Sequence, residues 1–389
     1  MSSAVPLPPF RMPAWRRAVL KVGSNLLAAE GGGLDDRHAG PLAAFVQHSV
    51  DQGREVVLVS SGAVAAGRAV LRQHALKATG GGLAARQALA AMGQVPVLEM
   101  WRKLSARPVA QVLLSHDDIR HRRRYLNARA TLRELLALDV LAVVNENDTV
   151  AVDELKLGDN DNLAAIVASL IEADVLLIAS DIDALYTADP RFDTTATPIR
   201  QVAQVTPEIL AMAGGSGSVV GTGGMRTKLK AAVTAAGRGI PTGLFDGRSA
   251  ATVAALEQGE LHGTWFHATA EQRLHARKHW LRHLPAVAGG LRVDDGARRA
   301  LGERQASLLP GGIVQVDGEF RRGDMVAVYA SNGLLLGQGL CQYGAAEIRC
   351  LAGQHSRDIE RILGYSHGTE VIHRDDLVVL DSLLAGAWR

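Results

Sequence analysis

The stretch VLAVVNENDTVAVDELKLGDNDNLAA, residues 140–165, joins three kinds of sequence in a row. It starts with a short apolar run, Val140 to Val144, of the kind that forms a strand buried on both faces of a parallel sheet. Polar and acidic residues follow, and from Leu163 the chain turns to a helical pattern rich in alanine and leucine. A strand, a polar loop and a helix in this order form the repeating unit of an α/β protein.

The same order recurs on both sides of this stretch. Further apolar runs typical of strands are Ala18 to Val22, Val56 to Val59, Val109 to Leu114 and Val175 to Ile178. Helical patterns lie at Ala39 to Gln52, Gly82 to Leu104, Ala128 to Ala137 and Leu163 to Ala173. The alternation predicts a mainly parallel sheet with crossover helices.

Polar residues follow four of the predicted strands, at the point where each strand ends. These groups are Lys21 to Asn25, Ser60 to Gly62, Asn145 to Asp148, and Ser180 with Asp181. Ligands of open parallel sheets bind outside the carboxyl ends of the strands, so we expect the four groups to meet in one crevice.

Two lysines stand out because the chain has 35 arginines and only 7 lysines. Lys21 precedes Gly23, and Lys228 ends the glycine-rich run from Gly221, which opens a helical pattern that stops at Gly237. A compact ammonium beside exposed backbone N–H groups suits phosphate. The alternatives are a surface lysine at a strand end and a flexible linker before a helix, and the glycine run lacks the lysine spacing of a P-loop.

Acids and amides alternate in the segment from Asp153 to Asn162, shortly after Asn145 to Asp148. An ordinary solvated loop has this composition too, but the spacing misses the calcium-binding EF-hand pattern. Two such clusters offer both donors and acceptors to a zwitterion, with carboxylates holding an ammonium and amides holding a carboxylate.

The chain shows no histidine or serine in surroundings typical of a general base. An alcohol acceptor usually needs such a base, whereas a carboxylate with a pKa near 4.3 is already ionised at pH 7. The obstacle for a carboxylate is repulsion by the phosphoryl group, roughly 4 kcal/mol per charge pair at about 4 Å and an effective dielectric near 20. Two lysines at the transferring group would offset that repulsion.

The composition excludes several classes of function. Over 389 residues, 47% are hydrophobic, 21% charged and 4% aromatic, and the net charge is +2, so neither a strongly basic nucleic-acid surface nor a stacking platform is expected. Cys341 and Cys350 have no second pair to complete a zinc site or disulfide framework, which suggests free thiols in the cytoplasm. No apolar run reaches the roughly 20 residues of a membrane span.

Six stretches together resemble the glutamate 5-kinase family of the amino-acid kinase superfamily. They are KVGSNLL from Lys21, VSSGAVAAG from Val59, LNARATL from Leu126, VNENDTVAVDELKLGDNDNLAA from Val144, ASDIDALYTADP from Ala179 and GTGGMRTKLKAA from Gly221. The resemblance implies a three-layer αβα fold with an eight-stranded, mainly parallel sheet. It also implies phosphorylation of the side-chain carboxylate of L-glutamate by ATP, giving L-glutamyl 5-phosphate, the first step of proline biosynthesis.

The resemblance also assigns residues to roles. Lys21 and Lys228 would stabilise the transferring phosphoryl group and Asp161 would orient them, while Ser61, Asp148 and Asn160 would hold glutamate. The residues implied in ATP binding are Lys21, Ser180, Asp181, Thr222, Gly223, Gly224, Met225, Arg226, Thr227 and Lys228. The family often has Thr at the position of Ser180, a change that keeps the hydroxyl. Mg²⁺ would be held mainly by the ATP phosphates.

The C-terminal part resembles a PUA domain, a small mainly-β barrel named for RNA-modifying enzymes, through SLLP at residues 307–310 and GGIVQVDGEFRRGDMV after it. We therefore expect a flexible arm over residues 1–14, a kinase domain over 15–285, a PUA domain over 286–370 and a tail over 371–389. Either the arm is a disordered extension of the protein, or translation naturally starts at Met12. Between Gly289 and Glu370 nine basic residues face ten acidic ones, which disfavours RNA binding.

Rival interpretations remain at this stage. Kinases of aspartate, N-acetylglutamate, carbamate or a nucleoside monophosphate share the superfamily, but Asp148 and Asp159 favour an acceptor with an ammonium. An RNA-binding regulator on a kinase-like fold is the rival from another class. The resemblance further implies proline as a feedback inhibitor within the glutamate site, and a dimer or tetramer formed through the kinase domain.

Overall fold

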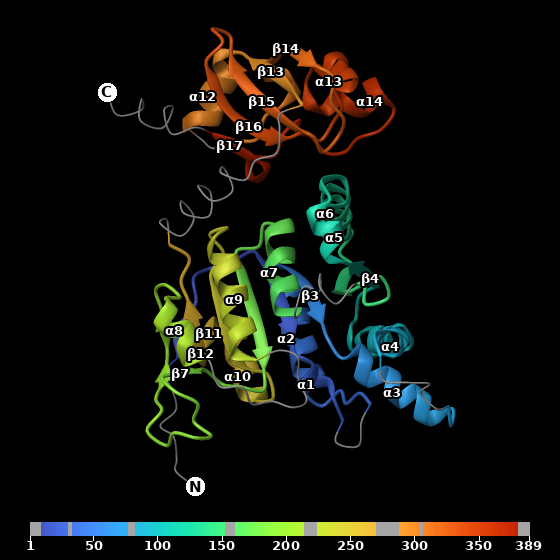
Figure 1. Cartoon of the computed structure of the whole chain (residues 1–389), viewed down its shortest axis with the longest axis vertical. Helices are drawn as coiled ribbons and strands as arrows, with labels where there is room; N and C mark the ends of the chain where they lie inside the picture. Colours follow the sequence, from blue (N-terminus) through green and yellow to red (C-terminus); the bar gives the residue numbers. More distant parts are fainter. Residues whose placement is uncertain are drawn as a thin grey trace. The chain divides into compact units, whose positions relative to one another are not determined.

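The computed structural model describes residues 9–29, 33–76, 82–151, 160–213, 224–269, 288–303 and 306–379 (Figure 1). The chain divides into two units. The larger one consists of Met1–Ile119 and Thr131–Ala276, and the smaller one of Arg120–Ala130 and Arg277–Arg389.

An eight-stranded sheet forms the centre of the larger unit, in the order β4-β5-β3-β2-β6-β10-β12-β9. The strands are β2 (Arg17–Val22), β3 (Glu55–Ser60), β4 (Val109–Leu114), β5 (Leu141–Glu146), β6 (Val175–Ser180), β9 (Gln201–Val202), β10 (Thr242–Asp246) and β12 (Gly263–Phe266). Neighbours run parallel except β10 and β12, which are antiparallel. The predicted eight-stranded, mainly parallel sheet is confirmed, as are the five predicted strands to within two residues at each end.

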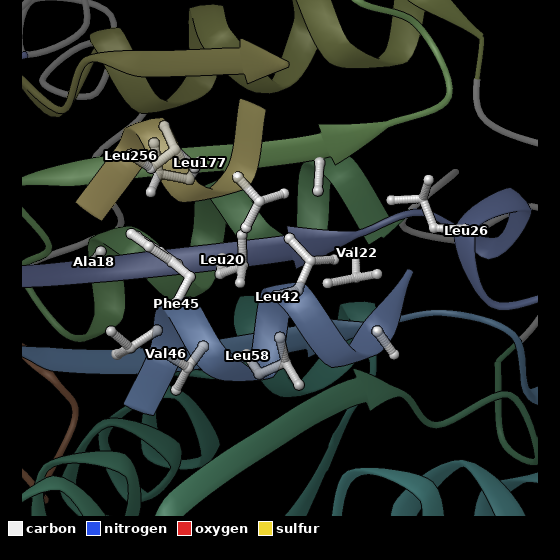
Figure 2. Close-up of a cluster of buried hydrophobic side chains, with 14 of the residues drawn as sticks. Ala18, Leu20, Val22, Leu26, Leu42, Phe45, Val46, Leu58, Leu177 and Leu256 are labelled. Carbon is white, nitrogen blue, oxygen red and sulfur yellow. The ribbon is translucent and has the colours of Figure 1, made fainter. Parts of the chain in front are cut away.

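Alternate residues of β2 enter different layers, as the twofold period of a strand requires. Ala18, Leu20 and Val22 face one side, where they pack with Leu58 of β3 and with the apolar face of α2 (Ala39–Asp51) (Figure 2). Helix α10 (Ala250–Glu257) contributes Leu256 to the same cluster. Burial of these side chains, at roughly 25 cal/mol per Å² of apolar area, holds this layer to the sheet.

The opposite face of the sheet is covered by α7 (Asn160–Leu170), which packs on β2, β3, β5 and β6, and by α9 (Met225–Ala236), which packs on α7 and β10. Lys21 belongs to the alternate set of β2 residues and reaches Asp161 in the first turn of α7. Helix α9 ends before Gly237, as the sequence predicts. The three-layer αβα arrangement thus places Lys21 on the side of α7 and α9.

Helices α3 (Ala63–Gln73) and α4 (Leu83–Leu104) touch backbone to backbone. A Cβ atom on Gly67 would overlap the carbonyl oxygen of Leu89, and one on Gly93 would overlap that of Ala63. Only glycine permits such an approach. It brings the middle of α4 next to the residues that follow β3.

The end of the N-terminal segment differs from the flexible arm expected for residues 1–14. Phe10 and Arg11 form β1 (Phe10–Arg11), which pairs antiparallel with β11 (Glu260–Leu261). The Phe10 ring stacks on Trp265 at 5.0 Å between centroids, and Met12 is buried in the core. Pairing with residues about 250 positions later, which no local pattern reveals, orders this part; residues 1–8 lie outside the described residues.

The smaller unit contains a five-stranded sheet in the order β14-β13-β15-β16-β17. The strands are β13 (Gly289–Val293), β14 (Ile313–Gly318), β15 (Met325–Ala330), β16 (Leu335–Leu340) and β17 (Leu377–Val379). Its helices are α12 (Asp295–Glu303), α13 (Ala345–Leu351) and α14 (Ile359–Leu363), with short 3-10 turns at Pro310–Gly312, Ser356–Asp358 and Arg374–Asp376. Val371 and Ile372 are buried and β17 pairs with β16, so the module continues past residue 370, where the tail was expected to begin.

Shorter elements complete the larger unit. They are α1 (Ser24–Leu27), α5 (His116–Arg120), β7 (Leu185–Tyr186), β8 (Pro198–Ile199) and α8 (Pro207–Met212). Helix α6 (Arg122–Ala137) is divided between the units: its residues up to Ala130 belong to the smaller unit, and those from Thr131 to the larger one. The expected boundary between residues 285 and 286 lies outside the described residues, which end at 269 and resume at 288. Among the helices described, none is both long and apolar enough to cross a membrane.

Candidate active site

The polar strand ends meet where the direction of the sheet's connections changes. Strand β2 lies between β3 and β6, and from β2 the chain builds the sheet outward on both sides. Such a switch point opens a crevice at the carboxyl ends of the strands. Lys21 near the end of β2, Ser60 at the end of β3 and Ser180 at the end of β6 lie at this edge.

Asp161 joins the two lysines that the sequence singled out. Its Oδ1 lies 2.6 Å from Nζ of Lys21, and its Oδ2 lies 3.3 Å from Nζ of Lys228. The three side chains are almost completely buried, with exposed fractions of 3% for Lys21, 4% for Lys228 and 0% for Asp161. A buried charge is tolerated when it is paired, and one carboxylate between two ammonium groups leaves this cluster with an excess positive charge for an anion.

Thr227 supports the same carboxylate from the first turn of α9. Its hydroxyl lies 2.8 Å from Oδ2 of Asp161 and 2.8 Å from the carbonyl oxygen of Gly224, and its single proton is donated to one of these two oxygens at a time. Gly224 is the N-cap of α9, and Met225 and Arg226 begin the helix. The N-terminus of a twelve-residue helix therefore lies beside the lysine pair, where its N–H groups favour an anion. Thr222 and Gly223 lie outside the described residues.

Asn160, one residue before Asp161, is bound to the end of β3 and to β5. Its amide nitrogen donates to Oγ of Ser61 at 2.7 Å, to the carbonyl oxygen of Ser60 at 3.0 Å and to Oδ1 of Asn145 at 2.9 Å. Gly62 follows Ser61 with φ at +100°, a conformation that favours glycine and lets the chain turn into α3. Ser61 and Asn160, predicted together as glutamate ligands, are in contact.

Asp148 lies in the turn that follows β5, two residues beyond Glu146, and is half-buried. Asp159, which the sequence grouped with it, lies outside the described residues.

The amide N–H of Gly23 donates to the carbonyl oxygen of Ala179 at 3.2 Å. The N–H of Gly23 therefore links the ends of β2 and β6.

Asp181 follows β6 and is held as an ionised carboxylate. Burial raises its pKa, but hydrogen bonds from Asn25 and Ser180, together with the charge of Lys228, outweigh burial and lower the pKa below its ordinary value. Nδ2 of Asn25 lies 2.8 Å from Oδ2, and Oγ of Ser180 lies 3.2 Å from Oδ1. The two predicted nucleotide residues are thus in contact, and Asn25 is a partner that the strand-end pattern included without a role.

Sequence reasoning did not identify the residues beneath Asn145 and Ser60. Gln94 of α4 is buried and accepts a hydrogen bond at Oε1 from Nδ2 of Asn145 at 3.2 Å. Trp101, also of α4, donates from Nε1 to Oγ of Ser60 at 2.8 Å. Both side chains lie on the buried side of α4, so the available signal was a glutamine among the buried residues of a helix.

Metal ligands do not cluster in the described part of the chain: it contains no group of three or more His, Cys, Asp or Glu side chains placed to hold an ion. A small hollow lies at the amino ends of the strands, beside Glu55 of β3 and Leu141 of β5, with Trp101 in its lining. Its position at the end of the sheet opposite to Ser60 and Glu146 separates it from the lysine cluster.

Comparison with known proteins gives concordant matches. The model of the amino acid kinase family matches residues 16–246, and that of the PUA domain matches residues 289–363. The chain is 60% identical over 365 residues to the glutamate 5-kinase of Xanthomonas euvesicatoria pv. vesicatoria (strain 85-10), covering 93% of this chain and 100% of that protein. It is 59% identical over 373 residues to the glutamate 5-kinase of Xylella fastidiosa (strain M23), covering 95% and 96%.

Among solved structures, UMP kinase from Bacillus anthracis matches with a TM-score of 0.44 and 16% identity, over 66% of this chain and 98% of that one.

Proposed function

Because this chain belongs to the amino acid kinase family, and within it to the glutamate 5-kinases, we propose that it transfers the terminal phosphoryl group of ATP to the side-chain carboxylate of L-glutamate. The products are ADP and L-glutamyl 5-phosphate, the activated intermediate that begins proline biosynthesis. The single observation that carries the mechanism is the buried cluster of Lys21, Asp161 and Lys228.

The carboxylate attacks the phosphorus atom directly, and the bond to the leaving oxygen of ADP breaks on the opposite side. Glutamate is already ionised, so no proton has to be removed and no covalent enzyme intermediate forms. Lys21 and Lys228 offset the repulsion between the attacking carboxylate and the phosphoryl oxygens. Their burial strengthens this effect because little water is left to screen their charges.

Asp161 acts through the lysines. Its two oxygens hold one ammonium each, and Thr227 fixes the second oxygen from α9. A carboxylate also limits the cost of burying two positive charges close together. We therefore assign Asp161 an orienting role, with Lys21 and Lys228 at the transferring group.

Glutamate binds between the end of β3 and the start of α7. Ser61, Asp148 and Asn160 are its proposed ligands, supported by the contact between Ser61 and Asn160 and by the position of Asp148 after the adjacent strand β5. Proline, like glutamate, carries an α-ammonium and an α-carboxylate, so we propose that it inhibits by competing for this site.

ATP binds along β6 and the start of α9, with Ser180, Asp181 and the segment Thr222 to Lys228 as its proposed ligands. Mg²⁺ would be bound mainly by the ATP phosphates, because the described residues provide no site with three protein ligands. The carboxylate of Asp181, which is kept ionised, is the nearby group that suits the ion. When bound, the ion neutralises phosphate charge. A reaction that consumes ATP, and the two free thiols of Cys341 and Cys350, suit the cytoplasm.

Hydroxylamine trapping tests the reaction. Purified protein with ATP, Mg²⁺ and L-glutamate should form glutamyl hydroxamate, because hydroxylamine captures the acyl phosphate. A panel of aspartate, N-acetylglutamate and carbamate provides the comparison. The proposal fails if glutamate yields no hydroxamate, or if N-acetylglutamate is preferred to the free amine.

We further propose that the enzyme assembles as a dimer or tetramer through its kinase domain and does not bind RNA. Sedimentation velocity would establish the first point. Gel-shift titration with RNA at low salt would contradict the second if it gave tight, salt-sensitive binding.

A further inference from the structure

A chain of side-chain amides runs from β4 through α4 and β5 to Asn160. Nε2 of Gln111 donates to Oε1 of Gln94 at 3.0 Å, and Nδ2 of Asn145 donates to the same oxygen at 3.2 Å. Oδ1 of Asn145 then accepts from Nδ2 of Asn160 at 2.9 Å. The bonds therefore converge on Oε1 of Gln94: Gln111 donates to it from one side, and Asn145, which itself accepts from Asn160, donates to it from the other.

Backbone groups fix which atom of each amide donates and which accepts, and they do so at three points. The N–H of Glu146 donates to Oδ1 of Asn145 at 2.9 Å, and Nε2 of Gln94 donates to the carbonyl oxygen of Glu146 at 3.4 Å. The carbonyl oxygen of Ser60 accepts from Asn160 at 3.0 Å. A backbone N–H cannot accept and a carbonyl cannot donate, so flipping one amide would set like atoms against each other at its anchor.

The consequence for Asn160 is that its amide nitrogen is fully used by the protein. Three oxygens, those of Ser60, Ser61 and Asn145, surround the two N–H groups. Its Oδ1 takes no hydrogen bond from the described residues and is the amide atom left for a ligand. An oxygen accepts, so its natural partner in a zwitterionic substrate is the α-ammonium.

Gln94 reaches this chain because of its neighbour in sequence. Gly93 lies against Ala63 and Gly67 of α3, where no side chain fits, and this approach carries Gln94 to a position that is only 8% exposed. A buried amide without partners is costly, so this position demands the contacts that Gln94 makes.

We propose that Gln94 is a positioning residue for the substrate: together with the backbone groups of Glu146 and Ser60, it holds Asn145 and Asn160 in the polarity that presents an oxygen of Asn160 to the α-ammonium of glutamate. The inference rests on the proposed function and refines it. It also reverses the sequence-based expectation that amides would hold the carboxylate, and it joins Asn160 to Asp148 as a group that selects the free amine.

Binding of glutamate and of glutarate, which lacks the ammonium, separates this role from a general structural one. Gln94→Met keeps the length of the side chain and removes both the acceptor and the donor. We expect the dissociation constant for glutamate, measured by calorimetry without nucleotide, to rise about ten- to a hundredfold, the effect of losing one hydrogen bond to a charged group. That for glutarate should change by less than about threefold, and the KM for ATP should stay unchanged.

Gln94→Glu conserves the acceptor, because a carboxyl oxygen still accepts from Asn145 and Gln111, and it gives up only the 3.4 Å bond to the carbonyl oxygen of Glu146. It should keep the preference for glutamate over glutarate, and any added negative charge would only strengthen that preference. Glu99→Gln, which alters an exposed ion pair with Arg102 on the same helix, is the control and should bind both ligands as the wild type does. Thermal unfolding of each variant checks that it is folded.

Two results would overturn the proposal: an equal loss of glutamate and glutarate binding in Gln94→Met, or loss of the preference in Gln94→Glu. If the proposed function itself is wrong, the wild type forms no glutamyl hydroxamate, whichever ligands the variants bind. The wild type must itself prefer glutamate to glutarate; equal binding of the two also contradicts the inference.

Discussion

At the scale of single residues, the arrangement around Asp161 explains why this chain places scarce lysines at Lys21 and Lys228. Both ammonium groups are buried against one carboxylate, and each comes from a different layer, one from β2 and one from α9. Their charges are therefore fixed in position before any ligand arrives, and the transfer of a phosphoryl group needs little further reorganisation.

Lys228→Ala should lower kcat for glutamyl hydroxamate formation by about a hundredfold or more, because removal of a fixed charge at a reacting group typically costs that much. Lys230→Ala is the matched control, since Lys230 is exposed on the same helix and should keep normal turnover. Wild-type kcat in Lys228→Ala would contradict the assignment.

His367 in the smaller unit makes stability depend on pH. Its ring lies 5.5 Å from that of Tyr343 and 5.1 Å from that of Tyr365. Burial and the charge of Arg322 lower its pKa, and Glu347 opposes them weakly. Because the pKa in the folded state is below that of the unfolded chain, the stabilisation is complete above the ordinary value, near 6.5, and is lost as pH falls through the folded value.

Thermal unfolding between pH 5 and 8 tests this. The wild-type smaller unit should lose stability below about pH 6.5, whereas His367→Phe, which keeps an aromatic ring and cannot titrate, should lose less. Identical slopes of unfolding temperature against pH in the two proteins would show that His367 does not contribute.

At the scale of elements, the contact of α3 with α4 matters most for the site. The two helices meet at Gly67 and Gly93, and the contact sets the position of Gln94 and Trp101, whose side chains reach Asn145 and Ser60. Two helices that are distant in sequence from the lysine cluster thus hold Ser60 and Asn145, which contact the proposed glutamate ligand Asn160.

Gly93→Ala should destabilise the larger unit by about 1–3 kcal/mol, the usual cost of overpacking, because its methyl group would overlap the backbone of Ala63. It should also weaken glutamate binding by displacing Gln94. Gly82→Ala, at the N-cap of the same helix, is the matched control, since no atom lies within 4 Å of the added group. Urea unfolding measures the stability of the two variants. If Gly93→Ala and Gly82→Ala are equally stable, α4 can shift without cost and the prediction is wrong.

At the scale of the whole molecule, the chain forms two units whose boundaries do not follow a single cut in the sequence. Residues 120–130 group with the C-terminal part, while residues 131–276 return to the kinase sheet. Within the smaller unit, Arg129 forms an ion pair with Asp376, and both side chains are buried. Asp376 lies just before β17, the strand that the expected boundary at residue 370 left outside the module.

Asp376→Ala should destabilise the smaller unit by about 3–5 kcal/mol, the usual cost of breaking a buried ion pair by removing one partner. The double variant Arg129→Met with Asp376→Leu should recover much of that loss. Glu319→Ala breaks an exposed pair with Arg349 and should cost about 1 kcal/mol or less. Equal effects of Asp376→Ala and Glu319→Ala on the unfolding temperature would contradict the importance of the buried pair.

The sequence by itself determined the elements of the kinase sheet and the residue types at its crevice. Buried strands appear as short apolar runs and helices as 3.6-residue patterns, both local signals, and parallel strands bring their carboxyl ends to one edge. Lys21, Ser61 and Ser180 could be predicted to gather there for that reason. Their roles in the reaction stay predictions until the variants are measured.

Only the tertiary structure decided which partners those residues have. Asp161 between two lysines, Gln94 beneath Asn145, β1 paired with β11 and β17 added to the second sheet all join positions far apart in the chain. No local periodicity encodes such contacts, because they depend on how closely packed layers approach one another. The polarity of Asn160 is the sharpest case: an asparagine can donate or accept, and only the fixed groups around it choose between the two.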